Sequence, residues 1–101
     1  MKGALSGAYA RLAESYYDQG NYAEALALYE KILAVRESEL GEDDPELIFD
    51  LNNVVRVLCV ENRFDGAESY CRRIISILEM TQPEDVQKLA ETLNMLAQIY
   101  F

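Results

Sequence analysis

The feature that most constrains this chain is an internal repeat, because the sequence resembles itself when it is shifted by 42 residues. The shift superposes residues of the same kind: Tyr22 on Phe64, Ala25 on Ala67, Ile32 on Ile74, and Gly20 on Asn62. A repeating unit of this length stacks on its neighbours, since one unit cannot bury its apolar face alone. The repeat therefore predicts a solenoid of like units.

The spacing of the apolar residues predicts that each unit consists of two helices. In the second unit, apolar residues recur at intervals of three and four along two stripes: Leu51, Val54, Val55 and Leu58, then Phe64, Ala67, Cys71, Ile74, Ile75 and Leu78. Asp44-Pro45 predicts the start of the first helix, because proline has no N–H to leave unpaired in a first turn. Asn62 predicts its end, because asparagine tolerates the left-handed conformation.

The first unit follows the same order. Its two stripes are Tyr9, Leu12, Ala13 and Tyr16, then Tyr22, Ala25, Tyr29, Ile32 and Leu33. Gly20 predicts the stop between them, and Asn21 with Glu24 predicts a capping box at the next helix. A third copy starts near Leu89, where Leu93 and Asn94 repeat Leu51 and Asn52. We therefore expect one domain over residues 1–101, divided into repeat 1 (about 5–46), repeat 2 (about 47–88) and a partial repeat 3 (about 89–101).

The order of large and small residues resembles the tetratricopeptide repeat (TPR). The quoted pattern is Tyr9-x2-Leu12-Ala13-x2-Tyr16 followed by Ala25-x3-Tyr29, and it returns as Leu51-x2-Val54-Val55-x2-Leu58 with Ala67-x3-Cys71. The same pattern begins a third time at Leu93-x2-Leu96-Ala97-x2-Tyr100. The resemblance implies an all-α fold, an α-α superhelix or TPR solenoid of antiparallel helix hairpins with about five helices.

The connector between the units resembles the kinesin light chain variety of these repeats. The residues that carry this resemblance are Leu40-Gly41-Glu42-Asp43-Asp44-Pro45 and Leu51-Asn52-Asn53. Asp44 stands where that variety has histidine, Val55 replaces the usual small residue, and the second connector, Met80-Thr81-Gln82-Pro83, lacks the Leu-Gly pair. A motor-cargo role is therefore not carried over.

The residues present exclude the commonest catalysts. The chain has no histidine, which removes Ser-His-Asp and Cys-His machinery and every histidine-ligated metal site. Its glycines are dispersed and form no phosphate-binding loop. The densest acidic cluster, Glu37, Glu39, Glu42, Asp43, Asp44 and Glu46, lacks the order of a calcium loop, and acids near a helix start favour a solvated capping role. We expect no enzyme, cofactor or metal.

Charge and cysteine usage narrow the partners and the compartment. A net charge of −9 disfavours nucleic acid and anionic membranes, and no apolar run is long enough to insert into a bilayer. Cys59 and Cys71 lack a CxxC spacing, so we expect two buried thiols. The start of the chain has too short an apolar core for a signal peptide. These features favour a soluble, cytoplasmic protein.

The resemblance also implies where a ligand lies, because the first helix of each such repeat lines a concave surface. It places these residues on that surface: Gly7, Ala10, Glu14 and Tyr17 in unit one, Phe49, Asn52, Arg56, Cys59 and Val60 in unit two, and Glu91, Asn94, Gln98 and Phe101 in unit three. The candidate peptide-binding groove consists of Glu14, Tyr17, Phe49, Asn52, Arg56, Asn94 and Gln98. Asparagine amides suit a peptide backbone, and Arg56 suits a carboxylate or carbonyl.

Two alternatives stay open at this point. In one alternative, Asn52, Asn53 and Asn94 only cap or bridge neighbouring helices. In the other, Arg56 is an ordinary surface cation near Glu14.

For function, we expect an adaptor or scaffold that binds a peptide or helix of a partner protein, with a neutral or partly basic peptide favoured. The alternative is a structural module that self-associates, as a homo-oligomer or within a larger array, through Leu96, Tyr100 and Phe101 of its terminal helix.

Overall fold

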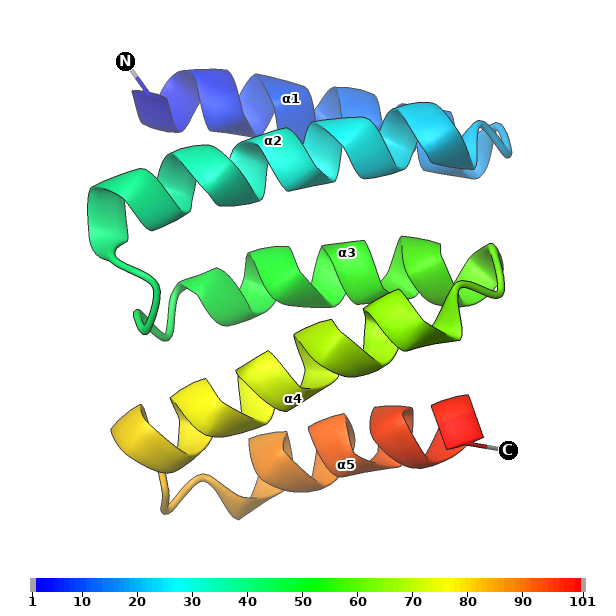
Figure 1. The fold of residues 1–101 in the computed structure, drawn as a ribbon. Helices are drawn as coiled ribbons and strands as arrows, with labels where there is room; N and C mark the ends of the chain where they lie inside the picture. Colours follow the sequence, from blue (N-terminus) through cyan, green and yellow to red (C-terminus); the bar gives the residue numbers. More distant parts are fainter. Residues whose placement is uncertain (1, 101) are drawn as a thin grey trace.

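The computed structural model describes the backbone of residues 2–100 and the side chains of residues 7–99. Its helices in chain order are α1 (Lys2–Asp18), α2 (Tyr22–Leu40), α3 (Leu47–Val60), α4 (Phe64–Thr81) and α5 (Val86–Tyr100) (Figure 1). No strand occurs in the described backbone, and none of its helices is long and apolar enough to cross a membrane. The prediction of an all-α fold with about five helices is confirmed.

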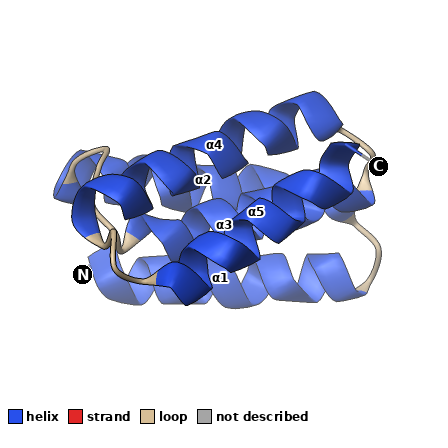
Figure 2. Ribbon diagram, turned by 90° about the horizontal axis from the view of Figure 1, so that it is seen from below, coloured by secondary structure: helices blue, strands red, loops and turns tan. Residues whose placement is uncertain are grey.

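The helices form a stack that follows the order of the chain. Each packs antiparallel against the next, so that α2 contacts α1 and α3, and α4 contacts α3 and α5 (Figure 1). Viewed from below, α2 and α4 lie toward one side of the stack, and α1 lies on the other (Figure 2). The two hairpins and the following helix are the arrangement that the internal repeat predicts.

The core is thickest around α3, which is enclosed by its neighbours α2 and α4. Its apolar face is almost completely buried: Leu47, Leu51, Val54, Val55, Val57 and Leu58. Ala13, Ala25 and Ala67 have no exposed surface, so small side chains at these positions let neighbouring helices approach closely. Two residues of the predicted stripes are not core residues, since Leu12 is 46% and Phe64 is 40% exposed.

The turns inside the two hairpins have the same geometry. Gly20 has φ +81° and Asn62 has φ +59°, which confirms that both residues of the superposed pair are left-handed. Asn21 donates its N–H to the carbonyl of Tyr16, and Arg63 donates to that of Leu58, each at 2.8 Å. Together with the bonds from Gly20 and Asn62 these make a Schellman motif at both helix ends.

The helix starts differ from the sequence predictions. α3 begins at Leu47 rather than at Pro45, although the Asp44 carboxylate does accept the N–H of Glu46 at 2.8 Å. The predicted capping box is wrong, because the Asn21 side chain makes no capping bond and donates to Gln19 instead. α5 begins at Val86, three residues before Leu89. The repeat boundaries themselves stay a prediction.

Candidate functional site

The clearest polar contact on the first helices joins α1 to α3. Nη2 of Arg56 donates to Oε1 of Glu14 at 2.5 Å and to the hydroxyl of Tyr29 at 3.0 Å. The Tyr29 hydroxyl in turn donates to the same Glu14 oxygen at 3.0 Å. Glu14 and Arg56 are 42 residues apart, so they occupy equivalent positions in the two repeats. This contact shows that equivalent residues of α1 and α3 lie side by side.

Aromatic rings surround the Arg56 guanidinium. Its central carbon lies 4.5 Å from the ring centroid of Tyr17 and 5.9 Å from that of Tyr29. Tyr17 also meets Tyr22 edge to face, with 5.3 Å between the ring centroids. A cation held over ring faces in this way is attracted by their electrons. We call Glu14, Tyr17, Tyr29 and Arg56 the Arg56 cluster.

The Arg56 cluster contains one anion and one cation, Glu14 and Arg56, whose pKa values both move away from neutral pH. Hydrogen bonding to Arg56 holds the pKa of Glu14 below its usual range, and burial followed by the hydrogen bond to Glu14 raises the pKa of Tyr29 to about 12. Desolvation opposes the charge on Arg56, but the Glu14 carboxylate raises the pKa of Arg56 overall. These pKa shifts keep Glu14, Tyr29 and Arg56 from exchanging a proton near pH 7, so the three groups suit binding rather than acid–base chemistry.

Tyr29 is the member of this cluster that was predicted only as part of an apolar stripe of the first repeat. Its side chain is only 2% exposed, as that prediction requires. A buried tyrosine hydroxyl nevertheless needs a hydrogen-bond partner, and here the partners are Glu14 and Arg56 of the predicted groove. This need for a hydrogen-bond partner was the signal in the sequence that could have predicted a polar contact at Tyr29.

A second polar feature lies between α3, α4 and α5. A pocket of about 240 Å³ is lined by Ile48, Asn52, Leu78, Lys88, Glu91, Thr92 and Met95. The carbonyl oxygen Oδ1 of Asn52 is buried and has no hydrogen-bond partner among the described residues. Leaving a buried acceptor unpaired costs roughly 1–3 kcal/mol, which the fold has to offset elsewhere. We call this the α3–α5 pocket.

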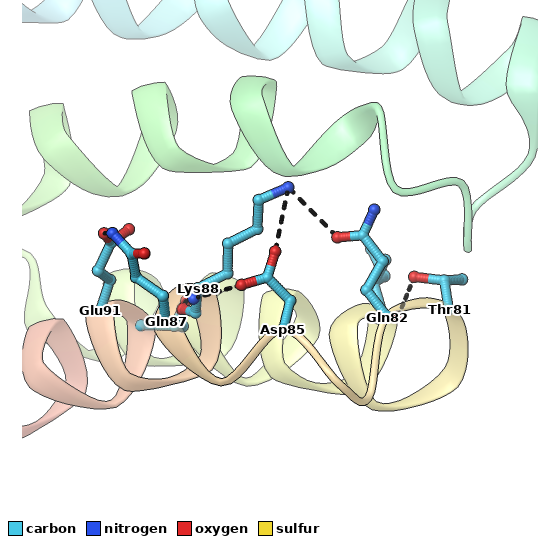
Figure 3. Close-up of polar contacts among 8 residues, drawn as sticks. Thr81, Gln82, Asp85, Gln87, Lys88 and Glu91 are labelled. Carbon is cyan, nitrogen blue, oxygen red and sulfur yellow. Dashed lines mark hydrogen bonds and ion pairs between the residues drawn. The ribbon is translucent and has the colours of Figure 1, made fainter.

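The charged residues of the α3–α5 pocket have different surroundings. The Lys88 ammonium donates to Oε1 of Gln82 at 3.3 Å and lies 3.8 Å from the Asp85 carboxylate, both in the α4–α5 connector (Figure 3). The Glu91 carboxylate accepts only a neutral amide bond, from Gln87 at 3.4 Å, among the contacts drawn in Figure 3. Asn52 and Glu91 belong to the predicted concave surface, whereas the other pocket residues were not predicted, because they come together from three helices.

The remaining groove residues are exposed and belong to neither feature. Phe49 is 69% exposed, three residues before Asn52 on the same face of α3. Asn94 and Gln98 are exposed on α5. Phe101, and the side chain of Tyr100, lie outside the described residues. The structure thus brings Glu14, Tyr17 and Arg56 together and sets Asn52 beside Glu91, while Phe49, Asn94 and Gln98 stand apart.

The acidic segment around the α2–α3 connector is paired or capping where its contacts are described. Arg73 reaches from α4 to the Glu37 carboxylate at 2.9 Å and to the carbonyl of Glu42 at 3.2 Å. Arg36 donates to the buried Asp50 at 2.5 Å, and burial raises the pKa of Asp50 despite this bond. The described residues contain no cluster of acids or cysteines able to hold a metal ion.

The two cysteines differ from each other. Cys71 is fully buried and burial raises its pKa to about 11, as expected for an inert thiol. Cys59 is only half-buried, so the prediction of two buried thiols is wrong for this residue. Cys59 packs against the edge of the core, as does Tyr17, which occupies the equivalent position in α1.

Comparison with known proteins is consistent with this architecture. No curated protein matches the chain. A family model described as "Tetratricopeptide repeat" matches residues 5–80, a span that covers nearly all of both helix hairpins and most of the chain. With the repeated hairpins, the shared Schellman turns and the small residues between helices, this match shows that the chain belongs to the tetratricopeptide repeat family.

Proposed function

We propose that this chain is an adaptor or scaffold module that holds an extended peptide or a helix of a partner protein against α1, α3 and α5. Membership of the tetratricopeptide repeat family supports a protein partner, because that family consists of non-catalytic interaction modules. The free cysteines support a reducing compartment such as the cytoplasm. Nucleic acid and membrane are not part of the proposal, given the net charge of −9.

The observation that carries this proposal is the stripe along α3 formed by Phe49, Asn52 and Arg56. Residues three and four apart share one face of a helix, so the stripe offers an aromatic ring, an amide and a cation in sequence. Phe49 is 69% exposed, so a ligand can reach its ring. A peptide laid along α3 would cover it.

The Arg56 cluster supports the same role through preorganisation. The two described hydrogen bonds of Arg56 both use Nη2, and a guanidinium has further N–H groups on Nε and Nη1. Because the Glu14 carboxylate and the Tyr17 ring hold the guanidinium in place, a partner carbonyl or carboxylate meets a donor that has already lost its freedom. The Glu14–Arg56 pair itself is partly exposed, so it stabilises the fold by about 1 kcal/mol or less.

The test is a double variant of the stripe. Arg56→Glu with Asn52→Ala is expected to abolish capture of a peptide selected from a random library, with the helical circular dichroism spectrum retained. Ser69→Ala with Ser76→Ala, at exposed positions of α4, is the matched control and should bind as before. Unchanged capture by the stripe variant would remove the groove as the binding surface.

A second function, self-association, is favoured by a different observation. Leu93 and Ala97 of α5 are exposed, whereas the equivalent Leu51 and Val55 of α3 are buried. A second copy could cover this apolar face and so form a homo-oligomer. Leu96 is half-buried, and Phe101 and the side chain of Tyr100 lie outside the described residues. Sedimentation at several concentrations distinguishes the two functions, because a strict monomer removes self-association.

A further inference from the structure

We propose that α5 pairs with α5 of a second copy of this chain, antiparallel and around a two-fold axis, through a row of four exposed apolar residues. The inference rests on the second function proposed above, self-association, and is independent of the peptide groove. The row consists of Val86, Ala90, Leu93 and Ala97, and we call it the α5 row. Val86 is 70% and Leu93 is 47% exposed, and both alanines are exposed as well.

The spacing of the α5 row is that of a helix that packs along another helix. Successive members are four, three and four positions apart, so they lie on one face at the average spacing of 3.5 residues used by paired helices. α5 has 15 residues and is therefore about 22 Å long. The row runs along most of this length, which gives a partner helix a continuous apolar surface.

The place of α5 in the stack favours an antiparallel partner. The helices α2, α3 and α4 each have an antiparallel neighbour on two sides, whereas among the described residues α5 packs chiefly on α4 (Figure 1). The residues of α3 that are equivalent to Leu93 and Ala97 are buried. A helix related to α5 by a two-fold axis perpendicular to it is antiparallel by symmetry. A second copy therefore continues the order of the stack.

The side chains of the α5 row alternate in size, so the row fits a reversed copy of itself. A two-fold axis at the middle of the row places Val86 opposite the partner's Ala97. It places Leu93 opposite the partner's Ala90. Each larger side chain then meets an alanine, which lets the two helices approach closely. A parallel copy would instead set valine against valine and leucine against leucine.

Charge also favours this surface for contact between copies. Two chains that each carry a net charge of −9 repel each other, so an uncharged surface suits their contact best. The α5 row is uncharged, and the two charged residues of α5, Lys88 and Glu91, line the α3–α5 pocket instead. Gln87 and Asn94 are exposed beside the row and are neutral amides, which donate and accept hydrogen bonds at the rim of a contact.

The first experiment is sedimentation equilibrium of the full chain over a range of concentrations. We expect a weak dimer with a Kd of the order of 100 µM, because one pair of short helices buries less surface than a standard protein interface. Raising the salt concentration from about 50 mM to about 500 mM should strengthen the dimer, since salt screens the repulsion between the two chains while the contact itself is uncharged.

A substitution in the row tests which surface forms the contact. Leu93→Glu places a charge in the apolar contact and should raise the Kd at least about tenfold. Leu12→Glu is the matched control, because Leu12 lies on α1, is 46% exposed and undergoes the same change in charge. It should leave the Kd nearly unchanged. Circular dichroism should show that both variants keep the helix content of the unaltered chain.

A pair of charges tests the antiparallel register. Ala90→Lys and Leu93→Glu should each prevent the homodimer, but a mixture of the two variants should form a heterodimer. In this heterodimer the introduced ammonium meets the introduced carboxylate, and the second contact between Leu93 and Ala90 is retained. Ala97→Lys mixed with Leu93→Glu is the control. There the ammonium faces Val86 and has no charged partner, so no heterodimer is expected in sedimentation.

Three results would overturn the proposal, and they differ in what else they remove. A strict monomer at the highest protein and salt concentrations removes the pairing of α5 and self-association together. A dimer that Leu93→Glu does not weaken leaves self-association in place but moves its contact elsewhere. A dimer that Leu93→Glu weakens, without a heterodimer specific to the mixture of Ala90→Lys and Leu93→Glu, excludes the antiparallel register. The peptide groove has its own test in Arg56 and Asn52.

Discussion

At the scale of single residues, Glu14 and Tyr29 depend on each other because both contact the same arginine. The pKa of Tyr29 is about 12 in the folded chain, compared with an ordinary value of 10.0. Neutral Tyr29 therefore contributes stability that is fully present below pH 10 and is lost as the pH rises through about 12. Burial is the largest cause of the shift, followed by the hydrogen bond to Glu14 and its charge.

This ordering of causes predicts the effect of a neutral substitution. Glu14→Gln should lower the pKa of Tyr29, because it removes the charge and the carboxylate acceptor while the burial remains. The pKa can be followed by NMR titration of ¹³C-labelled tyrosine rings. Glu24→Gln, at an exposed position of α2 outside the cluster, is the control and should leave Tyr29 unchanged. An unaltered pKa in Glu14→Gln would show that Glu14 does not act on Tyr29.

At the scale of the helices and turns, backbone geometry decides whether a substitution raises or lowers the stability of the fold. Gly20 ends α1 with φ +81° and Gly7 lies inside α1, and at both positions an added Cβ meets open space. The two glycines therefore differ in backbone conformation and not in the space available to a side chain. Asn62 occupies the left-handed position of the second hairpin with φ +59°, at some conformational strain.

The same glycine-to-alanine change should therefore have opposite effects at the two positions. Gly20→Ala is expected to destabilise the chain by about 1–2 kcal/mol, the penalty for a left-handed L-residue. Gly7→Ala should stabilise it by about 0.5–1 kcal/mol through helix propensity. Urea unfolding of the two variants measures both values. A loss of stability at both positions would contradict this account, and Asn62→Gly should behave as a neutral or stabilising change.

At the scale of the whole molecule, the place of a helix in the stack decides how deeply its residues are buried. Leu51 and Leu93 are equivalent in the repeat, but Leu51 is 0% exposed and Leu93 is 47% exposed. The reason is their surroundings: α3 is covered by α2 and α4, and among the described residues α5 packs chiefly on α4. Equal sequence therefore does not mean equal burial.

This difference predicts unequal effects of one substitution in the two helices. Leu51→Ala should destabilise the chain by about 2–5 kcal/mol, because it opens a cavity in the core. Leu93→Ala should cost about 1 kcal/mol or less, since little of the removed surface is buried. Thermal or urea unfolding gives both values. A similar large loss for Leu93→Ala at high protein concentration alone would indicate that a second copy covers α5.

Much of the fold follows from local chemistry and could be predicted. The spacing of Leu51, Val54 and Leu58 predicts a helix face, and the pairing of Gly20 with Asn62 predicts equivalent turns, because both depend on residues that are close in the chain. The helix starts were less accurate. Asn21 had the right residue type for a cap, but its side chain turns to Gln19, a choice between neighbouring partners that composition does not decide.

By itself, the sequence determined the helical class, the 42-residue period and the turn positions, because these depend on side-chain spacing and backbone preferences within one unit. Only the tertiary structure decided which polar groups are paired. Arg56 meets Glu14 and Tyr29 across three helices, while Oδ1 of Asn52 is buried between α3 and α5 without a partner. Such pairing depends on how closely distant helices approach, which short-range pattern does not specify.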